Sequence, residues 1–194
     1  PTLMIFREQV IVFEQAGAKI LTALQDGRLG TVDAPYAGPI CVDGNLTTEL
    51  LRDIAASPLF AKASLHIAPA SPGKAERLLA LMGHPSAVFY VNKEEAELIC
   101  RAEFPDAAAA AAGMVARGAK RVLVTDGGDM AAEATAEGVL TTTPPKVLVA
   151  RVTGAGDTFM AAHIVAEARG ATPQQALEAA VKAAATYVSG EHPE

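Results

Sequence analysis

The chain contains little of what marks secreted, nucleic-acid-binding or membrane proteins. Only two of its 194 residues are cysteines, Cys41 and Cys100, and neither has a metal-ligand neighbour in the sequence. This cysteine usage favours free thiols in a reducing cytoplasm. No basic run interleaved with aromatic residues occurs, and the net charge is -6. We therefore expect a cytoplasmic protein without a nucleic-acid partner.

Long apolar runs and targeting signals are absent as well. No segment reaches the length of a membrane span, and the N-terminus lacks the features of a signal peptide, so we expect no membrane association. The chain begins at Pro1 rather than Met, which indicates processing, trimming or a longer parent polypeptide. Structural or surface roles are expected for the four histidines, because none has paired ligands at metal spacing: His66, His84, His163 and His192.

What the sequence does contain is an alternation of β-rich and helical segments. Hydrophobic residues make up 51% of the chain, which is enough for one sizeable core. Strands are predicted at Ile40–Val42, Ser64–Ala68, Ala87–Val91, Arg121–Thr125, Met130–Thr135, Val139–Thr142 and Lys146–Val149. Helices are predicted at Thr48–Ala56, from Ser71 with Ala75, Leu78, Leu79 and Met82 on one face, at Lys93–Cys100, from Asp106 to Gly118, from the turn at Thr153 to Arg169, and from Thr172 to about Ser189.

Strand–helix alternation of this kind predicts a three-layer α/β domain with a mostly parallel sheet, here at residues 40–194. Residues 1–39 differ, because Phe6–Val12 and Lys19–Leu24 have β character and predict a small sheet beside the main domain, or its edge. Ligands of such domains bind beyond the carboxyl ends of the strands. Four loops follow predicted strands and should lie at that one edge, at Asn45, Asn92, Thr125 and Gly154.

The turn Thr153-Gly154-Ala155-Gly156-Asp157 opens a strongly apolar helix. Its two glycines allow a tight fold that points several N–H groups at one spot, where the helix N-terminus adds partial positive charge. Asp157 places a carboxylate beside this anion site. The pairing suits phosphoryl transfer, in which one group stabilises phosphate and another accepts a hydroxyl proton. Ordinary helix capping is the alternative.

Two further loops carry polar groups. Asn92 and Glu95 are spaced to face the same side of a first helical turn, where a carboxylate can hold Mg²⁺ through water. Taken alone, a capping box accounts better for this pair. The loop Thr125-Asp126-Gly127-Gly128 can let phosphates or ribose approach the backbone, although taken alone it is better explained as a plain turn.

In order and spacing, these motifs resemble the ribokinase-like, or phosphofructokinase-B, family of carbohydrate and nucleoside kinases. The resemblance covers Ile40 to the C-terminus. It comprises Asp43-Gly44-Asn45-Leu46, Asn92-x-x-Glu95, Val124-Thr125-x-Gly127, the turn from Thr153 to Asp157 and an Ala-rich final helix. It implies an ATP-dependent phosphotransferase with an alcohol group as acceptor.

The resemblance also implies a role for each matching residue. Asp157 would be the general base and would contact the substrate, and Gly154, Ala155 and Gly156 would form an anion hole with its N–H group. Asn92, Thr125, Gly127 and Thr153 would bind the nucleotide, and Glu95 would help to place Mg²⁺. Ala184, Tyr187 and Val188 are candidates for packing near adenine, with plain core packing as the alternative for each.

Within the family, segments around Asn45 and Lys74 resemble pseudouridine kinases and related nucleoside kinases. The implied substrate is a small sugar or nucleoside phosphorylated at a hydroxymethyl or 5′-hydroxyl group, with pseudouridine as the best guess. Asn45 and Lys74 would then contact the substrate, and a solvated lysine is the alternative for Lys74. The sequence leaves a homodimer open.

Three departures from the family pattern qualify the resemblance. Arg151 and Val152 stand where many members have Asp-Thr, in a region that helps to bind a monovalent cation in some members, which leaves such a cation in doubt. Met130 replaces a frequent glycine. No Gly-Gly motif for gripping a sugar precedes Ile40. Residues 1–39 would be a remnant of a β lid or edge strands. The rival hypothesis is a truncated, non-catalytic nucleotide-binding relative that acts as a sensor or scaffold. The absence of G-x-G-x-x-G after an early strand argues against a dinucleotide-dependent oxidoreductase.

Overall fold

The computed structural model describes residues 4–6 and 30–190. Within them, seven strands form one sheet in the order β1 to β7. The strands are β1 (Met4–Phe6), β2 (Pro39–Asp43), β3 (Ser64–Ala68), β4 (Ala87–Asn92), β5 (Arg121–Asp126), β6 (Met130–Thr135) and β7 (Gly138–Thr142). The first five run parallel, and β6 and β7 are antiparallel to their neighbours. The prediction of a mostly parallel sheet is confirmed.

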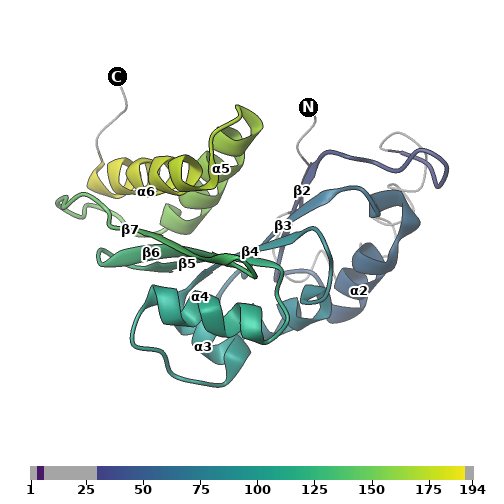
Figure 1. Ribbon diagram of the computed structural model, residues 1–194, viewed down its shortest axis with the longest axis horizontal. Coiled ribbons are helices and arrows are strands. Elements are labelled where there is room, and N and C mark those ends of the chain that lie inside the picture. Colours follow the sequence, from purple (N-terminus) through teal and green to yellow (C-terminus); the bar gives the residue numbers. More distant parts are fainter. Residues whose placement is uncertain (1–3, 7–29, 191–194) are drawn as a thin grey trace.

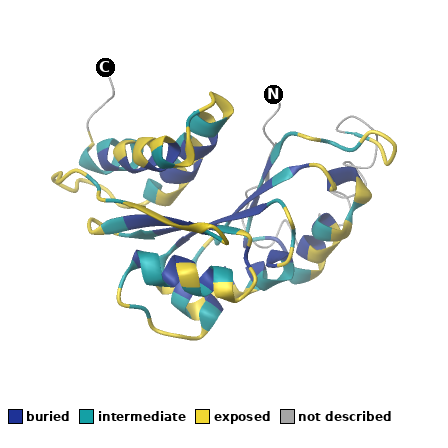
Figure 2. Cartoon of the chain, viewed as in Figure 1, coloured by how far each residue is buried: buried dark blue, intermediate teal, exposed yellow. Residues whose placement is uncertain are grey.

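Helices cover both faces of the sheet (Figure 1). One face carries α2 (Thr48–Ala56), η2 (Pro72–Leu81), α3 (Lys93–Cys100) and α4 (Ala107–Ala116), with the short turn η1 (Pro58–Phe60) beside α2. The other carries α5 (Ala155–Ala168) and α6 (Pro173–Ser189). Two apolar cores fill the spaces between the layers, as the buried inward faces of strands and helices show in Figure 2. The three-layer α/β arrangement is confirmed.

Capping residues explain why several helices begin where the sequence predicts. The Thr47 and Asp106 side chains accept hydrogen bonds from the first turns of α2 and α4. Thr172 and Gln175 form a reciprocal capping box at the start of α6, and Pro173 takes the first helical position. Side-chain acceptors of this kind satisfy amides that a helix cannot satisfy itself.

Two predicted elements differ from the structure. The segment from Pro72 is a 3-10 helix, so its buried side chains recur every three residues, at Ala75, Leu78 and Leu81. Lys146–Val149 is not a strand, because residues 143–150 have no regular secondary structure. Of the predicted N-terminal β segments, only Phe6 lies among the described residues, at the end of β1. Lys19–Leu24 and the remainder of Phe6–Val12 lie outside them, as does most of the proposed lid remnant.

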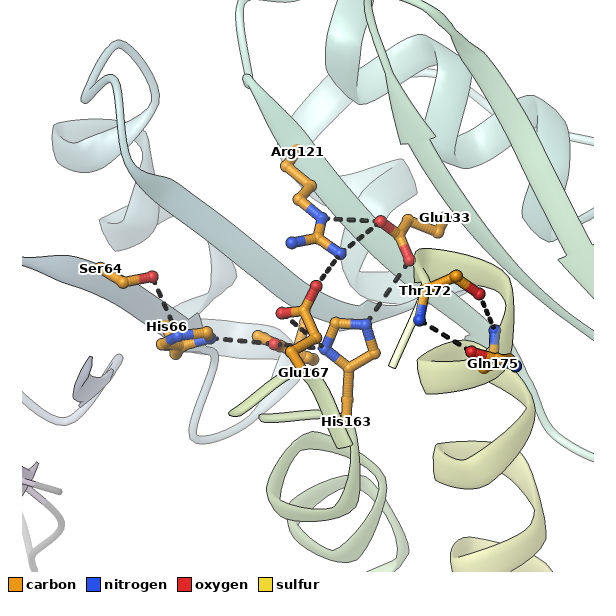
Figure 3. Close-up of polar contacts among 9 residues, drawn as sticks. Ser64, His66, Arg121, Glu133, His163, Glu167, Thr172 and Gln175 are labelled. Atoms are coloured by element: carbon orange, nitrogen blue, oxygen red, sulfur yellow. Dashed lines mark hydrogen bonds and ion pairs between the residues drawn. The ribbon is translucent and has the colours of Figure 1, made fainter. Parts of the chain in front are cut away.

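A buried polar cluster joins α5 to the sheet (Figure 3). Arg121 on β5 lies 2.6 Å from both the Glu133 and the Glu167 carboxylates. His163 on α5 lies 3.5 Å from Glu133, and its Nδ1 is 2.9 Å from the Tyr90 hydroxyl. The same hydroxyl lies 2.9 Å from Nδ1 of His66, whose other ring nitrogen meets Ser64. Such a cluster costs desolvation but fixes the register of the elements that it joins.

Candidate active site

A cleft of about 780 Å³ opens beyond the carboxyl ends of β3, β4 and β5, between the sheet and the helices α5 and α6. This is the edge where ligands of parallel α/β sheets bind, and the volume is in the range of small-molecule sites. Most of the predicted nucleotide-binding residues line it together with Glu95, namely Asn92, Thr125, Gly127, Ala184 and Val188. The lining also includes Ala155, Gly156 and Asp157.

The turn before α5 combines a left-handed glycine with the start of a helix. Gly154 adopts a φ of 95°, in the left-handed region that favours glycine, and helix α5 begins at the next residue. The Ala155 N–H donates to the carbonyl of Val152 at 3.0 Å. Gly156 follows in the first turn, where an α-helix supplies no acceptor of its own. Asp157 is exposed in that same turn and lines the cleft.

Asn92 and Glu95 form a capping box at the start of α3. The Asn92 side chain accepts from the Glu95 N–H at 2.8 Å, and Glu95 Oε2 accepts from the Asn92 N–H at 2.9 Å. Burial raises the pKa of Glu95, and the hydrogen bond from Asn92 offsets part of that rise. The capping explanation is therefore correct for the local structure. It is compatible with a ligand role, because both residues also line the cleft.

The chemistry of this cleft fits Mg²⁺ held by few protein ligands. Among the described residues there is no group of three His, Cys, Asp or Glu side chains placed to hold a metal ion. Mg²⁺ commonly keeps several waters and binds through one or two carboxylates together with substrate phosphates. Of the residues that the structure describes, Glu95 and Asp157 are the two carboxylates that line the cleft.

The cleft has an apolar wall that sequence reasoning largely missed. It is built by Met130 of β6, by the irregular segment 143–152 and by one stripe of α6, with Pro144, Val147, Val149, Val181 and Ala185 among its residues. A flat, largely apolar ring suits such a surface. The only sequence signal for the α6 part was the helical spacing of Ala184 and Val188.

Other predicted site residues lie outside the lining of the cleft. Asn45 and Lys74 lie together beyond β2, with Lys74 Nζ donating to Asn45 Oδ1 at 2.5 Å. Asn45 also donates twice to the Asp43 carboxylate. Thr153 and Tyr187 contact each other instead, because the Tyr187 hydroxyl donates to the Thr153 carbonyl at 2.9 Å. Gly154 lies against the same tyrosine.

Residues 15–193 match the pfkB family of carbohydrate kinases. The chain belongs to this family. The match spans nearly the whole sequence and includes every motif on which the resemblance rests. A search of curated proteins gave no match.

Solved structures with the same fold include a putative sugar kinase from Clostridium perfringens, with a TM-score of 0.72 at 18% identity over 93% of this chain and 55% of that one. Phosphofructokinase-2 from Escherichia coli, in complex with potassium, has a TM-score of 0.70 at 19% identity over 91% and 55% of the two chains. Adenosine kinase from Sinorhizobium meliloti has a TM-score of 0.65 at 17% identity over 77% and 48%.

These similarities establish the ribokinase-like fold. The chain spans about half the length of the solved structures that it matches. No helix among the described residues is long and apolar enough to span a membrane.

Proposed function

We propose that the protein catalyses, or supplies the catalytic half for, ATP-dependent phosphorylation of an alcohol group on a sugar or nucleoside. One observation carries the proposal. A single cleft holds the first turn of α5 with Asp157, the carboxylate of Glu95 and an apolar wall. The three features match the three parts of the reaction, which are proton removal, phosphate stabilisation and binding of a flat base.

In this mechanism the oxygen of the acceptor hydroxyl attacks the γ-phosphorus of ATP, in line with the departing ADP oxygen. The Asp157 carboxylate accepts the proton of that hydroxyl. The first-turn N–H groups of α5, with Gly156 foremost, stabilise the charge that develops on the transferred group. The Ala155 N–H group already donates to the Val152 carbonyl, so it contributes less to this stabilisation than the Gly156 N–H group.

Glu95, with Asn92 beside it, would hold Mg²⁺, most simply through water. When bound, the ion supplies charge neutralisation for the phosphates. Thr125 and Gly127 would contact phosphate or ribose at the end of β5. Ala184 and Val188 would pack against adenine together with Met130. Asp157 would act as the base from the first turn of α5, where it lines the cleft.

The acceptor is the less defined substrate. A nucleoside is our preferred class and pseudouridine our best guess, on the resemblance of the segments around Asn45 and Lys74. The Lys74–Asn45 hydrogen bond supports a shared role for the two side chains, two strands away from β4. A solved structure of the same fold is an adenosine kinase and another is a putative sugar kinase, so both classes belong in the acceptor panel.

The test is Asp157→Asn. We expect the variant to lose about 10²-fold to 10⁴-fold in kcat, the range for removal of a general base, while ATP affinity changes little. Asp53→Asn makes the same charge change at an exposed position of α2 and serves as the control. ADP release and ATP binding by calorimetry are the measurements. Near-parental turnover by the Asp157→Asn variant would falsify the base assignment.

A non-catalytic nucleotide sensor or scaffold is the second candidate, since the polar loops and the apolar wall of the cleft would suit a nucleotide whether or not an acceptor binds. The two functions separate in an ADP-release assay over a panel of nucleosides and sugars. ATP binding without turnover on any acceptor would favour the sensor. Intact mass of the expressed protein should be measured first, because it defines the chain that is assayed.

A further inference from the structure

The segment that leads into the α5 turn is held by the end of α6. Residues 150–153 have no regular secondary structure, yet a set of contacts ties them to Tyr187 and Val188. The Ala150 and Arg151 N–H groups donate to the Val188 carbonyl at 2.7 and 3.2 Å. Arg151 Nε donates to the Tyr187 carbonyl at 2.8 Å, and its guanidinium lies 3.9 Å from the centre of the Tyr187 ring. The Tyr187 hydroxyl completes the set by donating to the Thr153 carbonyl at 2.9 Å.

These contacts place Tyr187 directly against Gly154. A Cβ at position 154 would lie 2.5 Å from the Tyr187 hydroxyl oxygen and 3.0 Å from the adjacent ring carbon. The tyrosine therefore occupies the space that the left-handed glycine leaves. The chain turns into α5 at Gly154. If Tyr187 were displaced, Gly154 would be less constrained, and so would the direction in which the first N–H groups of α5 point.

Arg151 matters for a second physical reason. The last carbonyls of a helix have no intrahelical donor and carry the negative end of the helix dipole. The Tyr187 carbonyl near the end of α6 accepts from the Gly190 N–H group at 3.2 Å and from Arg151 Nε at 2.8 Å, while the flat guanidinium of Arg151 stacks on the Tyr187 ring. A lysine has the charge but not the planar fork, so it cannot make both contacts equally well.

We propose that Arg151 and Tyr187 are positioning residues for phosphoryl transfer, which together hold the Gly154 turn so that the first turn of α5 faces the transferred group. The inference rests on the proposed function for its catalytic consequence. Tyr187 thereby acts through the turn rather than by packing on adenine, since its helix neighbours Ala184 and Val188 line the cleft and it does not.

The experiment uses Tyr187→Phe, which keeps the ring and the stacking but removes the hydroxyl donor to Thr153. Arg151→Lys is the second variant, and Lys182→Ala, at an exposed position of α6, is the control. Amide hydrogen exchange of residues 150–158 measures how firmly the Gly154 turn is held, whether or not the protein is catalytically active. We expect at least severalfold faster exchange there in both variants and no change in the control.

We expect kcat of both variants to fall about tenfold, which is the effect of losing one hydrogen bond or of slightly misplacing the turn. KM for ATP should stay unchanged within about twofold. Equal exchange in Tyr187→Phe and the parent overturns the proposal. So does faster exchange with unchanged kcat in an active protein. A parent that releases no ADP with any acceptor contradicts the proposed function instead. In that case, faster exchange in the variants still supports the positioning contact and equal exchange still overturns it.

Discussion

Gly154 and Gly156 lie two residues apart, and the absence of a side chain has a different explanation at each. Gly154 needs its left-handed φ and the absence of a Cβ next to Tyr187. Gly156 needs neither, because a Cβ built there meets no atom within 4 Å and the residue is part of helix α5. No contact within the described protein explains the missing side chain at position 156, whereas a phosphate group approaching the first turn would.

Gly156→Ala turns this difference into a prediction. We expect unchanged or slightly raised thermal stability, because alanine is favoured over glycine in a helix by up to about 1 kcal/mol. Activity should fall at least about tenfold, since a methyl group would meet the transferred phosphoryl group. Thermal unfolding and ADP release are the measurements.

Gly83→Ala is the control, because a Cβ there also meets no atom within 4 Å and the residue lies outside the cleft. If Gly156→Ala were as active as Gly83→Ala, the first turn of α5 would not approach a phosphate.

The start of helix α3 has a structural role and, in the proposed function, a ligand role as well. Glu95 closes the capping box on Asn92 and also lines the cleft. Glutamine preserves the hydrogen bond to the Asn92 N–H, because its carbonyl oxygen accepts as the carboxylate does. It does not preserve the negative charge that Mg²⁺ prefers. One substitution thus separates the two roles.

Glu95→Gln should leave the unfolding temperature close to that of the parent while raising the Mg²⁺ concentration needed for half-maximal activity. Glu95→Ala should in addition lose about 1 kcal/mol of stability with the cap. Titration of Mg²⁺ in the ADP-release assay, beside thermal unfolding of both variants, tests this. Identical Mg²⁺ dependence of the glutamine variant and the parent would leave Glu95 with the capping role alone.

The elements also show where sequence reasoning succeeds and fails. Helices α2, α4 and α6 were predictable because each begins with a side-chain cap that reads directly from the sequence. The strand predicted at Lys146–Val149 is absent for a physical reason. Its three consecutive apolar residues look like a strand in the sequence, but Val147 and Val149 line the cleft and Leu148 is 92% exposed. A short apolar run does not show by itself that a neighbouring strand is paired.

At the scale of the whole molecule, most of the polar residues that line the candidate site were predictable, whereas few of its apolar residues were, namely Ala184 and Val188. Asn92, Thr125 and Asp157 stand where one secondary-structure element ends and the next begins, and a polar residue at such a junction indicates either capping or ligand binding. The apolar wall is assembled from β6, the segment 143–152 and α6, whose residues resemble ordinary core. Tyr187 lies outside the cleft lining and packs against the Gly154 turn instead. The spacing of residues along α6 could not predict this, because Gly154 is far from Tyr187 in the sequence.

The buried polar cluster links β3, β4, β5, β6 and α5, so its protonation bears on the stability of the whole fold. His66 is 4% exposed. Burial lowers its pKa to about 4, with the charges of His163 and Arg121 acting in the same direction. The groups around it in the cluster are Ser64, Tyr90, His163, Arg121, Glu133 and Glu167.

Stability should therefore fall on acidification through a defined window. The unfolded chain protonates His66 near its ordinary pKa of 6.5, whereas the folded protein resists protonation until about pH 4. Below 6.5 the unfolded state binds more protons, so the contribution of neutral His66, full above pH 6.5, is lost between pH 6.5 and 4 and amounts to about 3 kcal/mol. For Glu133, burial opposes but does not cancel the lowering of the pKa by His163 and Arg121, so its contribution is lost only at more acidic pH.

Urea denaturation at intervals from about pH 7.5 to about pH 4.5 measures this dependence. His66→Gln should be less stable than the parent at the upper end of this range, because it disturbs the bonds to Ser64 and Tyr90, yet it should lose less stability on acidification. Parallel curves for parent and variant would show that His66 does not carry the dependence. In that case other titratable groups would carry the acid sensitivity, and the carboxylates that pair with Arg121 and link α5 to the sheet would be the next to test.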